Sequence, residues 1–258
     1  MSPVDMLRPP VRRVRAWANR HNGRLVADLE RRYNLNQLQR FEAVLNRHGR
    51  SIRDAASILE FGCGDGRLTQ HLFEYAPAAA VSGCDVRREA VAACRRKCPQ
   101  GRFFVNRAAP PLEVVDAAFD FIYSYSVFTH LSESNHAAWL KELARALKPG
   151  GIMAHTVHSY AYLTRTAFFS PESLEKYHLA DSIEAFMRSG RDYYYVVEDP
   201  AMPEYGHTIM RKEYVAASWP RASGCALLEY VEGAIEAYPE GCQDLVLLAK
   251  PGPGAGAG

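Results

Sequence analysis

The feature that most constrains the fold is an alternation of short apolar segments with helical segments, which begins at residue 57. The apolar segments are 57–61, 79–84, 102–105, 119–124 and 152–157. The helical patterns between them are 66–75, 87–97 and 133–147, and a Lys148-Pro149-Gly150-Gly151 turn precedes the last apolar segment. Such an alternation predicts parallel strands joined by crossover helices, with helices on both faces of the sheet.

The remaining segments complete this architecture. Two later strands are expected at 225–231 and 243–248, and a helix at 171–189 begins after a Ser170 cap. Apolar residues at three-to-four spacing over 25–45 predict an amphipathic helix with a step near Asn34–Asn36, ended by Gly49. We therefore expect an α/β fold with a Rossmann-like, doubly wound, mostly parallel seven-stranded sheet. The expected parts are an N-terminal helical arm at 1–53, a core at 54–158, a cap inserted after strand five at 159–213, C-terminal strands completing the sheet at 214–250, and a disordered tail at 251–258.

Composition excludes several classes of protein. The 258 residues are 48% hydrophobic and 23% charged, which is ordinary for a globular chain and unlike a disordered or fibrous one. The net charge of +2 hides a division, because residues 1–53 hold 12 Lys and Arg against 4 Asp and Glu, while the remainder holds 19 against 25. A basic arm is therefore joined to a mildly acidic body.

The cysteines and the N-terminus bear on the compartment. Six cysteines are scattered through a chain too long to need disulfides, which predicts free thiols in a reducing cytoplasm. Cys94 and Cys98 are four residues apart, but no second Cys or His pair completes a metal site. The N-terminus lacks the apolar region of a signal peptide, and no apolar run approaches a membrane span. A cytoplasmic protein that binds no metal and no membrane is expected.

The chemistry is concentrated in the glycine-rich turn after the first strand, Leu59-Glu60-Phe61-Gly62-Cys63-Gly64-Asp65-Gly66. Glycines there let the backbone turn tightly and approach a ligand without a Cβ in the way. Arg67 stands where a dinucleotide-binding turn has its third glycine, and a loop led by Glu60 suits a cationic ligand better than a pyrophosphate. Asp85 ends the second strand, where a carboxylate can accept hydrogen bonds from both ribose hydroxyls of a nucleoside.

These residues resemble the class I S-adenosylmethionine-dependent methyltransferases. Glu60–Gly66 is similar to the first motif of that family, Asp85 to its acidic strand end, Phe119–Leu131 to its fourth strand and following loop, and Leu147–Gly151 to its turn before strand five. The resemblance covers roughly residues 57–158. The stretch Ser126–Leu131 is similar to bacterial members that modify small molecules and glycans.

The resemblance implies S-adenosylmethionine as cofactor and a role for each matching residue. Gly62 and Gly64 would let the loop pass under the methionine part, Glu60 would orient the loop or the ammonium group, and Asp85 would hold the ribose. Val86 would pack on the adenine, and Asn106 lies where the family often reads the adenine edge, although Asn106-Arg107-Ala108 replaces the usual Gly-Asp-Ala. The remaining cofactor-binding candidates are Cys63, Gly66, Ser124 and Ser126.

Methyl transfer leaves the protein to position the reactants and, for a hydroxyl or ammonium acceptor, to remove a proton. Histidine is suited to that role near neutral pH. The candidates are His158 after strand five, His130 in the loop after strand four and His207 in the cap. His130 alternatively caps the helix that begins near Ser132, and each of the others is alternatively a structural histidine.

The expected reaction is methylation of a small molecule or sugar, at oxygen and in secondary-metabolite or glycan biosynthesis, with a histidine base. N-methylation of a small molecule is one alternative. An NAD-dependent oxidoreductase and a non-catalytic cofactor-binding subunit are alternatives of other classes. The sequence Tyr123-Ser124-Tyr125-Ser126 lacks the motif of DNA amino-methyltransferases and an acidic pair for magnesium, so no DNA partner and no metal are expected. The basic arm is a solvated segment, a lid, or a contact for an anionic group of the acceptor, in a monomer or homodimer.

Overall fold

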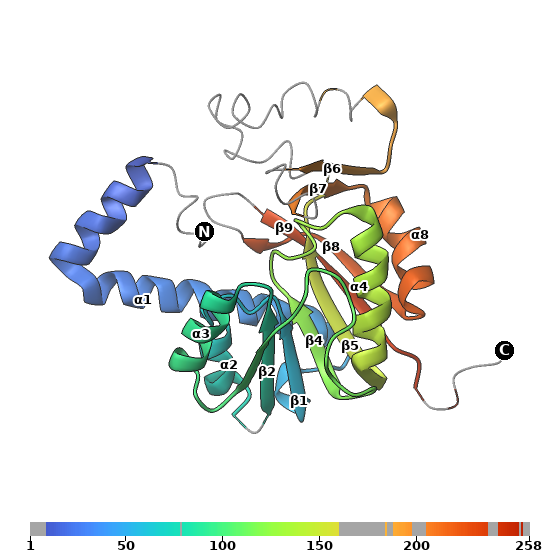
Figure 1. The fold of residues 1–258 in the computed structure, drawn as a ribbon, viewed down its shortest axis with the longest axis horizontal. Helices are drawn as coiled ribbons and strands as arrows, with labels where there is room; N and C mark the ends of the chain where they lie inside the picture. The colour runs from blue at the N-terminus through green and yellow to red at the C-terminus, as the bar shows by residue number, and fades with distance from the viewer. Residues whose placement is uncertain are drawn as a thin grey trace.

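A computed structural model of the chain describes residues 9–77, 79–159, 184, 188–197, 205–236, 242–252 and 254, with no side-chain description for 9–22, 24–26, 236 and 242. Seven strands form one sheet in the order β3-β2-β1-β4-β5-β9-β8 (Figure 1). Their bounds are β1 Ser57–Phe61, β2 Ala80–Asp85, β3 Arg102–Val105, β4 Phe119–Ser124, β5 Leu147–Val157, β8 Ala226–Glu236 and β9 Cys242–Ala249. Pairing is parallel from β3 through β5, whereas β9 runs antiparallel to both β5 and β8. The mostly parallel seven-stranded sheet is confirmed.

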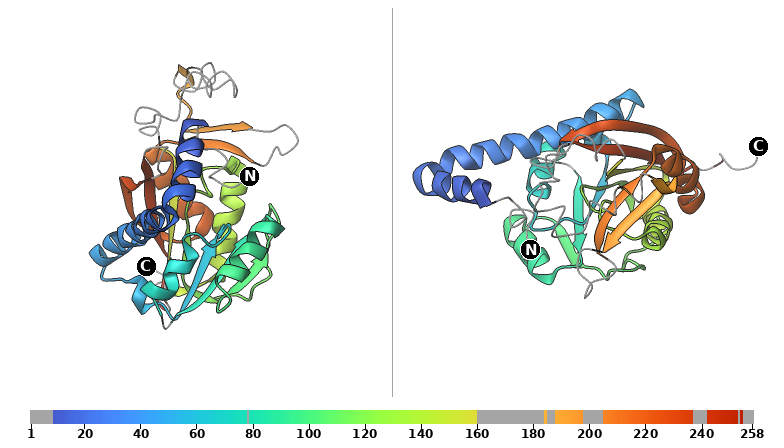
Figure 2. Two further views of the ribbon diagram at one scale, coloured as in Figure 1. Left: turned by 90° about the vertical axis from the view of Figure 1, so that its left-hand side faces the viewer. Right: turned by 90° about the horizontal axis from the view of Figure 1, so that it is seen from above.

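Helices cover both faces of the sheet, as the alternation predicts (Figures 1 and 2). One apolar layer joins the sheet to α4 (Glu133–Ala146) and α8 (Lys212–Ser223), with Trp139 and Trp219 fully buried in it. The opposite layer joins the sheet to α1 (Pro9–Arg47) and α2 (Thr69–Tyr75). Helix α3 (Arg88–Lys97) packs beside β3 in a smaller cluster. Because both faces are covered, the parallel strands are apolar almost throughout.

The N-terminal helix differs from the expected stepped helix. Helix α1 is continuous from Pro9 to Arg47 and passes through Asn34–Asn36 without a break. Asn34 and Gln37 are buried, at 3% and 1% exposure, so tertiary packing overrides the weak helix propensity of the asparagines. Gly49 follows the helix with a φ of +64°, which confirms it as the predicted end.

The C-terminal half of α1 is attached to the body, while its N-terminal half projects beyond the sheet (Figures 1 and 2). Leu38, Phe41 and Leu45 bury one face of the helix. Arg47 donates to Glu229 of β8 at 2.9 Å, and His48 contacts the same carboxylate at 2.8 Å. These contacts place a long helix beside the sheet edge formed by β8.

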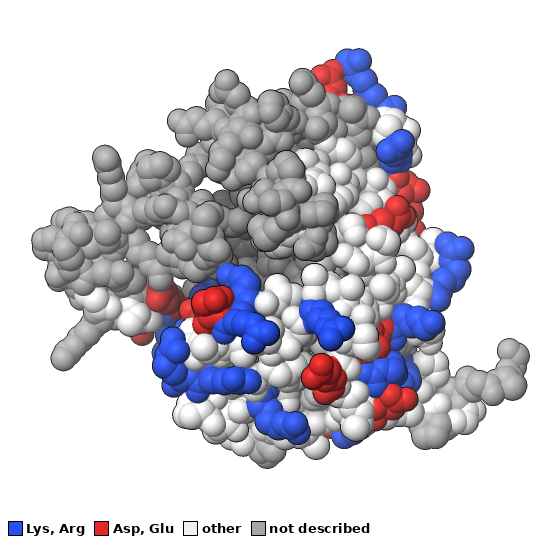
Figure 3. All heavy atoms as spheres, in the orientation of Figure 1, with Lys and Arg blue, Asp and Glu red and all other residues white. Residues whose placement is uncertain are grey.

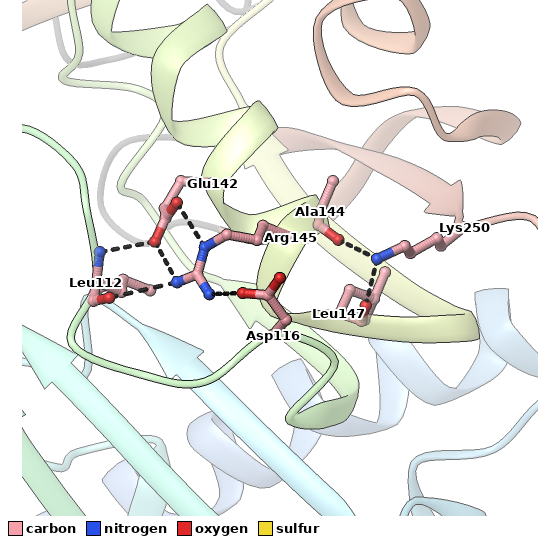
Figure 4. A network of polar contacts seen from close by, with 7 residues as sticks. All are labelled: Leu112, Asp116, Glu142, Ala144, Arg145, Leu147 and Lys250. Carbon is pink, nitrogen blue, oxygen red and sulfur yellow. Dashed lines mark hydrogen bonds and ion pairs between the residues drawn. The ribbon is translucent and has the colours of Figure 1, made fainter.

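The junction of α4 with β5 also differs from the prediction. The expected turn at Leu147–Gly151 is the beginning of β5, because Leu147 pairs with Phe119 before a register shift that leaves the extra residues on β5. Lys250 donates to the carbonyls of Ala144 and Leu147 at 2.7 and 2.8 Å, and so satisfies groups that the end of α4 leaves open (Figure 4). In the same network Arg145 of α4 binds Glu142, Asp116 and the carbonyl of Leu112.

The segment between β5 and β8 contains elements that the sequence pattern did not predict. Strands β6 (Tyr193–Val197) and β7 (Gly206–Met210) form a two-stranded antiparallel sheet, and α8 follows directly. The predicted helix at 171–189 lies mostly outside the described residues, of which Glu184, Arg188 and Ser189 are helical. Strand β7 docks on the loop after β4, where Gly206 N–H donates to His130 O at 3.1 Å and Thr208 N–H to Thr129 O at 2.9 Å.

The described surface shows mixed charge. On the face of Figure 3, Lys and Arg side chains gather over the region of α2 and α3, with acidic side chains among them. Helix α3 alone contributes Arg88, Arg95, Arg96 and Lys97. Among the helices described, none combines the length and the apolar character needed to cross a membrane.

Candidate active site

The glycine loop after β1 has the conformation that the sequence predicts. Gly62, Gly64 and Gly66 have φ angles of +83°, +54° and +80°, a region that residues with a Cβ rarely adopt. A Cβ at Gly62 would lie 2.2 Å from Cγ2 of Val127, and a Cβ at Gly66 would lie 2.9 Å from Sγ of Cys94. The glycines therefore allow both the turn and the close approach of its neighbours.

Glu60 lies beneath this loop and is buried, with 3% exposure. Its Oε2 accepts a hydrogen bond from the Thr69 hydroxyl at 2.5 Å. Burial raises the pKa of Glu60 from 4.5 to about 7, although the hydroxyls of Thr69 and Tyr123 and the charge of Arg67 act in the opposite direction. A buried carboxyl group of this kind gains free energy from a cationic ligand placed against it.

Asp85 connects the glycine loop to the end of β2. Its Oδ2 accepts from the Gly64 N–H at 2.9 Å, and its Oδ1 accepts from the Arg87 N–H at 2.9 Å and from Arg87 Nε at 3.3 Å. Val86, the next residue, is 52% exposed, which is unusual for a valine between two ordered elements. A carboxylate beside an open apolar surface is the arrangement expected for binding a nucleoside.

The structure gives the other cofactor-binding candidates different surroundings. Asn106 donates to the Arg107 carbonyl at 2.8 Å, while its Oδ1 is inaccessible and has no hydrogen-bond partner among the described residues. Cys63 is 4% exposed and packs in the cluster of Cys94 and Phe103. Ser124 is fully buried, and its hydroxyl contacts Nδ1 of His155 at 2.9 Å within the core.

Ser126 forms a strained turn directly after β4. Its φ of +58° lies in the left-handed region, and its N–H donates to Oγ1 of Thr156 at 2.7 Å. The next residue, Val127, is the one that packs against Gly62. The turn after β4 therefore touches the glycine loop directly.

The three histidines singled out from the sequence lie together. His130 stacks on Tyr205 with ring centroids 4.7 Å apart, and its centroid is 5.7 Å from that of His207. Nδ1 of His130 donates to the Gly206 carbonyl at 2.8 Å, which fixes the ring against β7. His158 is close enough to both other imidazoles that their charges affect its ionisation. The cluster joins the ends of β4 and β5 to β7.

Burial keeps two of these imidazoles neutral. It lowers the pKa of His158 well below 6.5, and the neighbouring His130 and His207 lower it further. Burial likewise lowers the pKa of His207 to about 4. A neutral imidazole can donate or accept a hydrogen bond. A nearby anion would favour its protonated form.

Sequence reasoning missed two residues that the structure places here. Arg87 binds the carboxylate of Asp85 through its N–H and its guanidinium group. The indication in the sequence was a basic residue two positions after the acid that ends the strand. Gln243, at the start of β9, is fully buried and contacts both Ser126 and His158. The only indication in the sequence was an amide residue at the start of an apolar strand. That position points to the site only once β9 is known to run antiparallel to β5.

The residues present fit S-adenosylmethionine. Gly62 and Gly64 provide the turn, the buried carboxyl group of Glu60 would suit a cation, the carboxylate of Asp85 would suit a ribose, and the exposed Val86 would suit the adenine. Among the described residues, no group of three or more His, Cys, Asp or Glu side chains is arranged to hold a metal ion.

Comparison with known proteins agrees with this geometry. The family model described as a methyltransferase domain matches residues 58–151. A trans-aconitate 2-methyltransferase from Azoarcus sp. is 37% identical over 105 residues, which are 40% of this chain and 39% of that protein. The chain thus spans about two fifths of the length of this relative. A protein of the same name from Delftia acidovorans is 26% identical over 72% of this chain and 75% of its own length.

Solved structures share the fold. A methyltransferase from Burkholderia thailandensis, described as 1,6-didemethyltoxoflavin-N1-methyltransferase with bound 1,6-didemethyltoxoflavin and S-adenosylhomocysteine, has a TM-score of 0.56 at 17% identity, over 94% of this chain and 88% of its own. An S-adenosylmethionine-dependent methyltransferase from Methanosarcina mazei has a TM-score of 0.54 at 18% identity, over 78% of this chain and 94% of its own. The chain therefore carries a methyltransferase domain, and its fold is that of the class I S-adenosylmethionine-dependent methyltransferases.

Proposed function

We propose that the chain transfers a methyl group from S-adenosylmethionine to an oxygen of a small organic acid. The observation that carries this proposal is the cluster of His130, His158 and His207 where the ends of β4 and β5 meet β7. Several relatives are named trans-aconitate 2-methyltransferase, and trans-aconitate is a tricarboxylic acid. Neutral imidazoles can donate hydrogen bonds to the oxygens of a carboxylate acceptor.

Each part of the chain has a defined task in this reaction. S-adenosylmethionine, when bound, would supply a methyl group on a sulfonium sulfur for transfer to the acceptor oxygen. Glu60 and Asp85 hold the cationic and ribose parts of that cofactor, and the turn at Ser126 closes against the loop that carries them. The histidines bind and orient the acceptor, and the hairpin of β6 and β7 covers them from water. Positioning and dehydration are the principal contributions of the protein.

The lowered pKa values of His158 and His207 support a carboxylate as the acceptor. A carboxylate is already ionised at neutral pH, so its methylation requires no base. A hydroxyl acceptor, such as that of a sugar, is the second candidate, because neutral His158 or His207 is able to accept a proton. That reaction would be inefficient, since a base whose pKa lies far below the working pH is weak.

The test is transfer of a tritiated methyl group to trans-aconitate, to a neutral sugar and to a primary amine, followed by treatment of the product with alkali. We expect transfer to the acid, and release of the label as methanol, because a methyl ester is hydrolysed by alkali while an ether or a methylamine is not. An alkali-stable product would refute the carboxylate proposal. Binding of NADH without binding of S-adenosylmethionine would refute the methyltransferase activity itself.

A further inference from the structure

Gln243 is a buried polar residue that the proposed reaction does not use. It is 0% exposed and stands two residues before the buried apolar run Leu245–Leu248 of β9. Because β9 runs antiparallel to β5, with Asp244 opposite Val157, the start of β9 lies where β5 ends. Gln243 thereby reaches the edge of the sheet at which the candidate active site lies.

The amide of Gln243 connects two parts of that site. Its Nε2 lies 2.9 Å from Oγ of Ser126 and 3.2 Å from Nε2 of His158. An amide nitrogen is a donor only, so it must face the unprotonated nitrogen of a neutral imidazole. The proton of His158 is then on Nδ1. One side chain thus determines which nitrogen of His158 is protonated and how far the ring lies from the turn after β4.

The contact between Gln243 and Ser126 also bears on the glycine loop after β1. Ser126 has the strained φ of +58°, and Val127 beside it packs on Gly62. The Ser126 hydroxyl also lies 3.3 Å from the Thr129 hydroxyl, in the segment that pairs with β7. Gln243 therefore holds Ser126, which connects the glycine loop after β1 to the segment that carries His130.

The remaining atom of the amide argues against a purely structural role. Oε1 of Gln243 is inaccessible and has no hydrogen-bond partner among the described residues. A buried acceptor without a partner destabilises the folded state, and an apolar residue would avoid that cost. The contacts of Nε2 are the feature that an apolar residue would lose.

We infer that Gln243 is a positioning residue, which holds His158 in the Nδ1–H tautomer and ties it to the strained turn at Ser126. The inference rests on the proposed function in one respect, namely that His158 faces the methyl acceptor. The state of the imidazole itself is measurable whether or not an acceptor is known.

The test is imidazole nitrogen NMR of the full chain saturated with S-adenosylhomocysteine. The nine histidines give few signals, and His158→Asn identifies those of His158. In the wild type we expect a protonated Nδ1 and an unprotonated Nε2. Gln243→Glu replaces the donor with a carboxylate of the same shape, so the proton should move to Nε2. Gln243→Leu should leave a mixture of the two tautomers.

A control is Glu142→Gln, because Glu142 is another buried polar residue, 8% exposed, whose contacts are with Leu112 and Arg145 near the end of α4. It should leave the His158 signals unchanged. Identical His158 signals in the wild type and both Gln243 variants, or an Nε2–H tautomer in the wild type, would overturn the inference. If Gln243→Leu does not fold, the comparison with Gln243→Glu still decides it.

Activity gives a second readout. With trans-aconitate as acceptor, Gln243→Leu should lower kcat about tenfold through misplacement of the ring. A wild type that is inactive on this acid would count against the proposed function alone, because the NMR comparison decides the role of Gln243 independently.

Discussion

Replacing Glu60 with Gln should change how stability depends on pH. The pKa of Glu60 is about 7 in the folded chain and 4.5 in the unfolded reference, chiefly because of burial. Between these values the unfolded chain has released its proton while the folded chain retains it, so the free energy of unfolding falls by about 1.4 kcal/mol for each pH unit. The wild type therefore loses about 3 kcal/mol across this window, and the loss is complete above pH 7.

Glu60→Gln carries no titrating group, so it avoids that loss. We expect its free energy of unfolding, relative to the wild type, to rise by about 3 kcal/mol between pH 4.5 and pH 8. Urea unfolding at several pH values measures the difference. The absolute offset between the two proteins includes the altered hydrogen bond to Thr69, and only its change with pH tests the reasoning.

Glu142→Gln is the matched control, because Glu142 is also buried, at 8% exposure, but has a lowered pKa. Burial raises that pKa, and the hydrogen bond and charge of Arg145 more than offset it. A carboxylate with a lowered pKa loses its contribution only as pH falls below its ordinary value of 4.5. The Glu142→Gln difference should therefore stay constant from pH 4.5 to pH 8. A Glu60→Gln difference that is equally flat would refute the assigned pKa.

Three further changes test the site and the fold. Asp85→Ala removes the carboxylate proposed to hold the ribose and should weaken S-adenosylmethionine binding about ten- to hundredfold by calorimetry, as expected for charged hydrogen bonds of about 1.5–3 kcal/mol; unchanged affinity would contradict the assignment. Gly83→Val should lower the unfolding free energy by about 1–3 kcal/mol in thermal melts, since even its Cβ would lie 2.8 Å from Cβ of Cys63. His158→Ala should reduce turnover while leaving cofactor affinity intact, and turnover that survives this change but not His207→Ala would move the essential imidazole to the cap.

The cofactor half of the site was largely predictable because its information is local. Gly62, Gly64 and Gly66 predict positive φ angles, and all three have them in the structure. Asp85 was predicted to end the second strand, and it does so in the structure, where its carboxylate accepts a hydrogen bond from the Gly64 N–H. Parallel strands place their carboxyl ends at one edge, so residues far apart in sequence could be assigned to one site from the alternation alone.

The acceptor half depended on contacts that sequence patterns do not reveal. His207 was a candidate by residue type, but its neighbours follow from β7, a strand that the pattern of 159–213 did not predict. The hairpin of β6 and β7 is short and is held by hydrogen bonds to the loop after β4 more than by any hydrophobic periodicity of its own. Gln243 was missed for the same reason, because its partners lie 117 and 85 residues away.

The sequence by itself determined the α/β class, the mostly parallel sheet, the glycine loop and the acid at the end of the second strand, because each of these depends on local conformation and on spacing along the chain. Only the tertiary structure decided that α1 runs unbroken through Asn34–Asn36, that Leu147–Gly151 begins a strand, and that three histidines meet at one edge of the sheet. The lowered pKa values of His158 and His207 are likewise a product of burial, and burial is a property of the packed molecule, which no stretch of sequence carries alone.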